Sequence, residues 1–280
     1  MSSYLSATRI LLLLVLSSLC LHARSDGESG YDFECLREEV PCGCGRENAH
    51  LSEPRVISGE AAVPYSWSML VSIRLKGTDK HACGGTVLNE SYVLTSATCV
   101  AQTYILGMTI AAGHHYASAS NATIRQVDGV FIHPNYTGNA SQYLNDIAIL
   151  HLAQALDLGN DSYVSRSCIA QLLDFLPSPI YVPAVESMLA VVGWGTTSYE
   201  DQTEPALVQQ ALVYAANDSD SDCPVVEAEH DFQFCAGQER RDIGGEYELI
   251  REQRSNQTYA FVPFSSLYWY AVSCLIDSIA

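Results

Sequence analysis

Basic side chains are scarce in this chain. Lysine and arginine together number 14 against 32 aspartates and glutamates, and the only lysines are Lys76 and Lys80. The formal net charge of −18 repels phosphate backbones and excludes a nucleic-acid-binding protein. Apolar residues make up 48% of the chain and charged residues 16%, a balance that excludes wholesale disorder and favours a globular fold.

The sequence also lacks an apolar run long enough to span a membrane. A mainly apolar run of twelve residues, Ile10–Leu21, follows Arg9 and precedes a short polar stretch. This order predicts a secretory signal peptide over residues 1–23. The aromatic stretch Tyr259–Ala280 is interrupted by serines and an aspartate, so we expect a strand or a disordered end there. No membrane association is expected once the signal is removed.

Seven of the nine asparagines stand in Asn-x-Ser/Thr sequences, which are acceptors for N-linked glycans. That share favours a chain that meets the glycosylation machinery, and it predicts a secreted, extracellular glycoprotein. In that compartment its ten cysteines are expected to form disulfides. The seven asparagines are Asn89, Asn121, Asn135, Asn139, Asn160, Asn217 and Asn256.

The chain divides into regions that differ in amino-acid composition. Residues 24–55 are acidic, turn-rich and cysteine-bearing, and they resemble a short propeptide more than a domain. From Val56, short β-prone runs recur between Gly, Asn and Pro signals, which predicts an all-β sandwich or barrel. After residue 237 the sequence becomes charged and then aromatic. The β-prone runs are Met69–Leu75, Tyr92–Thr95, Thr109–Ala112, Ile147–Leu152, Leu189–Val192 and Leu207–Val213.

Seven short motifs follow one another between residues 55 and 237, and together they resemble the trypsin-like serine proteases. The motifs are Arg55-Val56-Ile57-Ser58-Gly59, Pro64-Tyr65-Ser66-Trp67, His81-Ala82-Cys83-Gly84-Gly85 followed by Thr95-Ser96-Ala97-Thr98-Cys99, Ile132-His133-Pro134-Asn135-Tyr136, Asn145-Asp146-Ile147-Ala148, Gly193-Trp194-Gly195 and Cys235-Ala236-Gly237. The resemblance implies a domain over residues 56–280 that is made of two antiparallel six-stranded β-barrels. The first barrel is expected over about 56–165 and the second over about 175–280, divergent after 237 and incomplete at its C-terminus, with the site in the cleft between them.

In that family a serine attacks the scissile carbonyl, a histidine carries the proton, and a buried aspartate orients the histidine. The resemblance places Asp146 at the aspartate position and Thr98 at the histidine position. A threonine hydroxyl is too weak an acid and base to cycle a proton near neutral pH. We therefore expect Asp146 to hydrogen-bond a hydroxyl, such as that of Thr98, or water.

The nucleophile position also departs from the family pattern. The alignment places Ile243 at the serine and Arg241 at a glycine of the oxyanion hole, and no Gly-Asp-Ser-Gly occurs anywhere in the chain. An isoleucine side chain has no nucleophilic atom. The resemblance thus implies an inactive homologue. It also implies activation by cleavage between Arg55 and Val56, with the freed Val56 amine pairing with Asp242.

The resemblance also suggests how the cysteines pair. It pairs Cys83 with Cys99 and Cys223 with Cys235, and it ties Cys168 to one of Cys35, Cys42 or Cys44. The other two of those three are expected to pair with each other. Cys274 is left over, either free or linking two chains in a disulfide-bonded dimer.

Some histidines and acidic residues could suggest further chemistry. His114 and His115 could be a metal site or a substitute base, but tandem histidines diverge on a strand, so a solvated turn is expected. His81 lies where the family has a structural histidine. The acidic stretch Asn217–Asp231 lacks a calcium-loop spacing and is expected to be a solvated loop. No metal and no cofactor is predicted.

Three hypotheses about function remain open. The first is a secreted, inactive serine-protease homologue that binds a protein partner as a decoy or protease cofactor. The second is an active serine endopeptidase acting on polypeptides, of which this sequence is a faulty or variant transcript. The third is a structural glycoprotein dimerised through Cys274.

Overall fold

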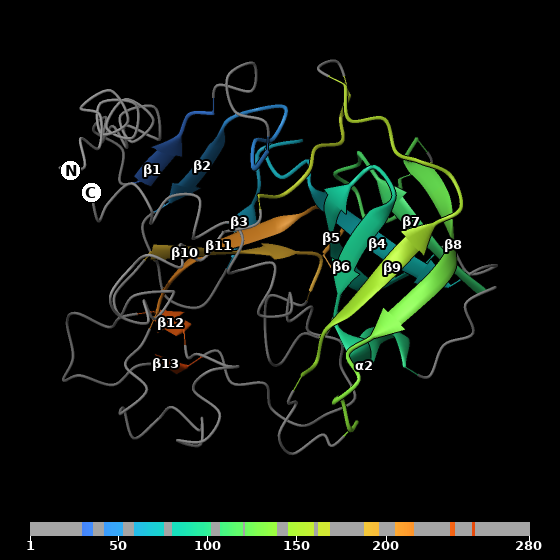
Figure 1. The fold of residues 1–280 in the computed structure, drawn as a ribbon. Coiled ribbons are helices and arrows are strands. Elements are labelled where there is room, and N and C mark those ends of the chain that lie inside the picture. Colours follow the sequence, from blue (N-terminus) through green and yellow to red (C-terminus); the bar gives the residue numbers. More distant parts are fainter. Residues whose placement is uncertain are drawn as a thin grey trace, which may run out of the picture.

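A computed structural model describes residues 30–35, 42–52, 59–75, 80–101, 107–119, 121–138, 145–159, 162–168, 188–195, 205–215, 236–238 and 248–249. Its main feature is a closed, antiparallel six-stranded barrel (Figure 1). The strands occur in the order β4-β5-β6-β9-β8-β7 around the barrel. They are β4 (Leu70–Leu75), β5 (His81–Asn89), β6 (Tyr92–Thr95), β7 (Met108–Ala112), β8 (Thr123–Ile132) and β9 (Ala148–Leu152).

Alternate residues of these strands fill the barrel. Val71, Val87, Val93, Ile110 and Leu150 are fully buried in one cluster. Successive side chains of a strand point to opposite faces, so every second residue faces the barrel interior. β4 is buried along both faces: its Ser72 hydroxyl contacts His81 Nδ1, and its Arg74 donates to the Ala117 carbonyl.

A second antiparallel sheet lies beside the barrel (orange and gold in Figure 1). It has the order β10-β11-β12-β13, and β3 pairs with β11 to give five strands. The strands are β3 (Glu60–Ala61), β10 (Met188–Gly193), β11 (Gln209–Ala215), β12 (Ala236–Gln238) and β13 (Glu248–Leu249). Of the two barrels that were predicted, the first is closed, and this sheet represents the second in the described residues.

The described part of residues 24–55, which resemble a short propeptide in sequence, forms two strands. β1 (Gly30–Phe33) pairs with β2 (Ala49–Ser52), and Ala49 and Leu51 are buried in a core cluster with Trp67, Trp194 and Leu212. We refer to residues 30–52 as the N-terminal segment. Its β2 lies against β11, so sequence-distant parts of the chain share this core.

Three disulfides are present in the described residues. Cys83–Cys99 ties β5 to the short helix α2 (Ala97–Val100), as predicted. Cys42–Cys168 and Cys35–Cys44 resolve the pairing that the sequence left open. Gly45 allows the chain to approach Ser66 closely, because a Cβ there would lie 2.0 Å from the Ser66 carbonyl oxygen.

The six strands predicted from β-prone runs are all present within one or two residues of their expected bounds. β5 and β8 were not among them. Gly84 and Gly85 in β5 and the polar residues of β8 weaken the β signal there. In the described ranges, no helix has the length and hydropathy needed to cross a bilayer.

Candidate functional site

Thr98 and Asp146 form the centre of the candidate site. Thr98 lies in the first turn of α2, where backbone N–H groups have no partner within the helix. Its N–H donates to Asp146 Oδ1 at 2.6 Å, and its hydroxyl donates to Oδ2 at 2.7 Å. The expected hydrogen bond between the two side chains is therefore present. In the part of the chain that the structure describes, Thr98 holds both carboxylate oxygens.

Tyr136 extends this cluster by one hydroxyl. Its OH lies 3.1 Å from Thr98 Oγ1. Because Thr98 gives its own hydrogen to Asp146, the Tyr136 hydroxyl is the donor in this contact. The three residues form a chain of hydrogen bonds from phenol to hydroxyl to carboxylate. A phenol and an aliphatic hydroxyl do not exchange protons readily at neutral pH, so this chain does not provide general-base catalysis.

A tight turn fixes the position of Tyr136. The Tyr136 N–H donates to the His133 carbonyl at 3.0 Å, and the Asn135 N–H donates to His133 Nδ1 at 3.2 Å. Asn145 Nδ2 donates to the Asn135 carbonyl at 3.4 Å, and Asn145 adopts a left-handed backbone (φ 56°) just before Asp146. The turn and the strand end that presents Asp146 are thus held together.

His81 is half-buried and packs near Trp194. Its Nδ1 lies 2.8 Å from Ser72 Oγ, and its ring centroid lies 5.2 Å from that of Trp194. Burial lowers the pKa of His81 to about 4, with further lowering by His114 and Arg74. His81 is therefore neutral at pH 7 and fills space between the two sheets.

The expectation of a solvated turn at His114 and His115 is wrong, since each is only 7% exposed. Gly113 adopts φ 68° after β7 and turns the chain, and the His114 ring stacks on Trp194 at 4.8 Å. The His115 carbonyl accepts from Trp194 Nε1 and from the Val208 N–H, and burial lowers the pKa of both histidines. These residues connect the barrel to the second sheet.

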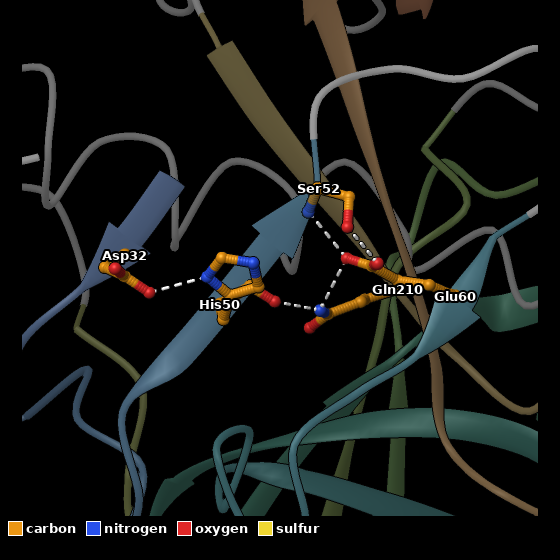
Figure 2. Close-up of polar contacts among 5 residues, drawn as sticks. All are labelled: Asp32, His50, Ser52, Glu60 and Gln210. Carbon is orange, nitrogen blue, oxygen red and sulfur yellow. Dashed lines mark hydrogen bonds and ion pairs between the residues drawn. The ribbon is translucent and has the colours of Figure 1, made fainter. Parts of the chain in front are cut away.

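A second polar cluster joins the N-terminal segment to the second sheet (Figure 2). The buried Gln210 amide donates to the His50 carbonyl and, at 3.1 Å, to Glu60 Oε1. The Ser52 N–H donates to Glu60 Oε1 at 2.7 Å, and the Ser52 hydroxyl donates to Oε2. Burial raises the pKa of Glu60, but the hydrogen bonds from Ser52 and Gln210 outweigh it, so the pKa lies below its usual value.

Asp32, His50 and Ser52 in this cluster are residue types that could serve hydrolysis. His50 Nδ1 pairs with Asp32 Oδ1 at 2.6 Å, but the Ser52 hydroxyl donates to Glu60. The serine is thus engaged by a carboxylate rather than activated by the imidazole. The cluster is an anchor, and sequence reasoning missed it because Gln210 lies 160 residues from His50, to which it donates.

Several predicted site residues lie outside the described residues. They are Arg55, Val56, Arg241, Asp242, Ile243, Cys223, Cys235 and Cys274, together with the sequon asparagines Asn139, Asn160, Asn217 and Asn256. The acidic stretch Asn217–Asp231 lies outside them as well. In the ranges that are described, no group of three or more potential metal ligands occurs.

A closed six-stranded barrel, a second antiparallel sheet and an aspartate just before β9 define a protein of the trypsin-like fold. A family model described as Trypsin matches residues 56–245, and the chain belongs to that family. The mouse serine protease neuropsin shares the fold, with a TM-score of 0.53 and 22% identity over 69% of this chain and 82% of its own.

Curated relatives agree with this assignment. Proproteinase E of Bos taurus is 29% identical over 240 residues, which cover 76% of this chain and 85% of the relative. Chymotrypsin-C of Rattus norvegicus is 30% identical over 229 residues, which cover 76% of this chain and 79% of the relative. The predicted trypsin-like family and all-β fold are therefore confirmed.

Proposed function

We propose that this trypsin-family protein is secreted, has no peptidase activity and works by binding a protein partner, as a decoy or protease cofactor. The observation that carries the proposal is the Thr98–Asp146 contact. The carboxylate that would orient an imidazole is instead held by a main-chain N–H at 2.6 Å and a hydroxyl at 2.7 Å.

The size of the expected loss supports inactivity. In a serine protease of unrelated fold, removal of the histidine or the serine alone lowers turnover by about 10⁶. What then remains, roughly 10³ to 10⁴ over water, depends on the oxyanion hole and on substrate binding. The family resemblance puts Thr98 at the histidine position, and it puts Arg241 and Ile243 where the family has the oxyanion hole and the nucleophile.

Binding is supported by what the chain keeps. The barrel core is intact, and the turn around Tyr136 and Asp146 is held by several hydrogen bonds. A rigid scaffold of this kind can present loops to a partner without performing chemistry. The net charge of −18 favours a partner with a basic surface.

Secretion is supported by the signal-like N-terminus, the sequons and the disulfides. The three disulfides of the described residues are typical of oxidising compartments. The sequon asparagines Asn121 and Asn135 are exposed, as a glycan acceptor must be. The predicted signal peptide lies outside the described residues.

A fluorophosphonate probe tests the lack of activity. The mature protein should show no labelling, both before and after cleavage at Arg55, while an active trypsin-family enzyme in the same solution is labelled. Labelling of any serine that disappears on heat denaturation would overturn the proposal. It would instead support the hypothesis of an active endopeptidase.

A binding experiment tests the positive half of the proposal. Saturating amounts of the protein should change the rate at which an active trypsin-family enzyme is activated from its precursor or blocked by a protein inhibitor. The effect should weaken with rising salt if the acidic surface contributes. No effect on either rate would remove the decoy and cofactor roles.

A further inference from the structure

Three glycan acceptor sequences lie in the described residues, and their asparagines differ in setting. Asn89 is half-buried, and its Oδ1 accepts from the N–H groups of Ser91 at 2.9 Å and Tyr92 at 3.0 Å. Asn135 is exposed on the turn beside Asp146. Asn121 is also exposed, but it lines a hollow of about 360 Å³ together with Thr123 and Arg125 of β8.

The hollow has an aromatic wall. The rings of Tyr65 and Tyr163 meet with centroids 4.6 Å apart, and the Arg46 guanidinium lies 4.7 Å from the Tyr163 ring centroid. Tyr65 holds a left-handed backbone (φ 65°), which is uncommon for a bulky residue. Tyr163 is nevertheless 48% exposed, so much of this fixed platform faces solvent.

Apart from Gly113 and Val164, the rest of the lining is polar, and hydrogen bonds hold Arg125 and Asp157 in place. Arg125 donates from Nε to the Ala155 carbonyl and from Nη1 to the Ile124 carbonyl, both at 3.0 Å. Asp157 Oδ1 accepts from the Gly159 N–H at 2.9 Å. A carboxylate retains further acceptor sites when one is filled, so Asp157 can still receive a hydroxyl hydrogen.

An aromatic face beside fixed donors and acceptors matches the surface of a sugar. An N-acetylhexosamine presents C–H groups on one ring face, with hydroxyls and an acetamido group around its edge. Aromatic rings bury the C–H face of the sugar, and polar side chains hydrogen-bond its hydroxyls and acetamido group. The volume of the hollow lies near the lower end of the range of small-molecule pockets.

We propose that this hollow is the seat of the first sugar of an N-linked glycan on Asn121. The inference rests on the proposed secretion. In the attachment step, Asn121 Nδ2 bonds to the anomeric carbon of the sugar and loses a proton, and the sugar's bond to a lipid diphosphate carrier breaks as that diphosphate leaves. Asn121 and Thr123 of the same sequon both line the hollow, so the attached sugar is held beside it at high effective concentration.

Release kinetics on the native glycoprotein test the seat. The protein is produced in a secretory eukaryotic host, and an amidase that cuts the bond between asparagine and the first sugar is applied without denaturant. Release from Asn121 should be about tenfold slower than from Asn135, a factor that corresponds to ~1.4 kcal/mol of docking. Peptide mass spectrometry follows both positions in one sample.

Two variants distinguish docking of the first sugar in the hollow from nonspecific steric protection of the glycan against the amidase. Tyr163→Ala should bring release at Asn121 to the rate at Asn135, because the platform is lost. Phe131→Ala removes an aromatic side chain of similar exposure on β8, outside the hollow, and should leave the tenfold difference unchanged. Equal release rates at the two asparagines in the unaltered protein would overturn the inference.

Radical footprinting gives an independent reading. Tyr163 should be protected while the glycan is present, should stay protected after trimming to one sugar, and should become reactive in Asn121→Gln. Tyr116, 57% exposed and outside the hollow, is the reference. If Asn135 carries a glycan and Asn121 does not, the seat is refuted while secretion stands. If none of the seven sequons is occupied, the proposed secreted glycoprotein fails together with the seat.

Discussion

The barrel and the core beneath the second sheet are built in different ways. The barrel core is formed mainly by alternating residues of its own six strands, and Ala97 and Val100 of α2 and Leu156 and Val164, after β9, add to it. The other core combines Ala49 and Leu51 of the N-terminal segment with Trp67 and Leu70, before and in β4. It also includes Trp194, which follows β10, and Leu212 of β11. The first kind of core follows from local strand patterns, whereas the second exists only when four distant stretches come together.

The largest effects should come from truncating one leucine in each core. Leu51→Ala should lower the free energy of unfolding by about 2–5 kcal/mol, as should Leu150→Ala in the barrel, because each is at most 1% exposed. Denaturant titration measures both, and Leu75→Ala, 41% exposed, is the control. A loss below about 0.5 kcal/mol for Leu51→Ala would mean that the N-terminal segment is an appendage after all.

Acid should lower the free energy of unfolding, because it protonates His81, whose ring packs near Trp194. Its pKa is about 4 in the folded protein and about 6.5 when unfolded, so the unfolded chain binds the proton more readily. The stability that neutral His81 contributes should fall by about 3 kcal/mol as pH drops from 6.5 to 4, with no further loss below 4.

The contribution of His81 to stability is measured by comparing how the denaturation midpoints of two proteins depend on pH. Denaturation midpoints of the unaltered protein and of His81→Asn are measured from pH 7.5 to 3.5, so that losses from other groups cancel. The variant should show a shallower fall between pH 6.5 and 4. If the two plots of midpoint against pH run parallel, protonation of His81 does not account for the loss of stability in acid.

The polar anchor in Figure 2 should contribute less than either leucine. Gln210→Ala removes the acceptor of the Trp67 Nε1–H, at 2.8 Å, and the donor to the His50 carbonyl. We expect a loss of about 2 kcal/mol, since buried polar groups lose their partners. Gln209→Ala, on the more exposed neighbour, should cost much less in the same denaturation measurement.

The smallest effects should come from Thr98. Thr98→Val keeps the backbone N–H contact with Asp146 and should cost no more than about 1 kcal/mol, while Thr98→Ser should be near neutral. Thr98→His should restore no peptidase activity, because a general base without a nucleophile cannot start acyl transfer. Cleavage of a peptide by Thr98→His alone would contradict the assignment of Ile243.

The sequence could predict what depends on short patterns. Strands such as β6 and β9 follow from runs of β-prone residues, and the pairing of Cys83 with Cys99 follows from the family motif. The sequence also offered the Thr98 hydroxyl, beside water, as a partner of Asp146, because the two motifs that contain them lie at one site in the family.

Other features depend on contacts with residues that are distant in the sequence. His114 and His115 looked solvated because nothing near them in sequence covers them, and Trp194, about 80 residues away, does so. The acidic N-terminal segment resembled a propeptide in sequence, because the residues that bury its Ala49 and Leu51, such as Trp67, Trp194 and Leu212, lie far along the chain. The sugar-sized hollow likewise joins residues 65, 121 and 163.

The Cys42–Cys168 disulfide joins a residue that precedes the Arg55–Val56 peptide bond in sequence to a residue that follows it. A cut there would give a two-chain molecule whose parts stay covalently joined in air-oxidised buffer and separate only under a thiol reductant. An affinity tag placed at the mature N-terminus would therefore still retrieve the whole protein after such a cut, and nicked and intact samples would co-elute on a sizing column.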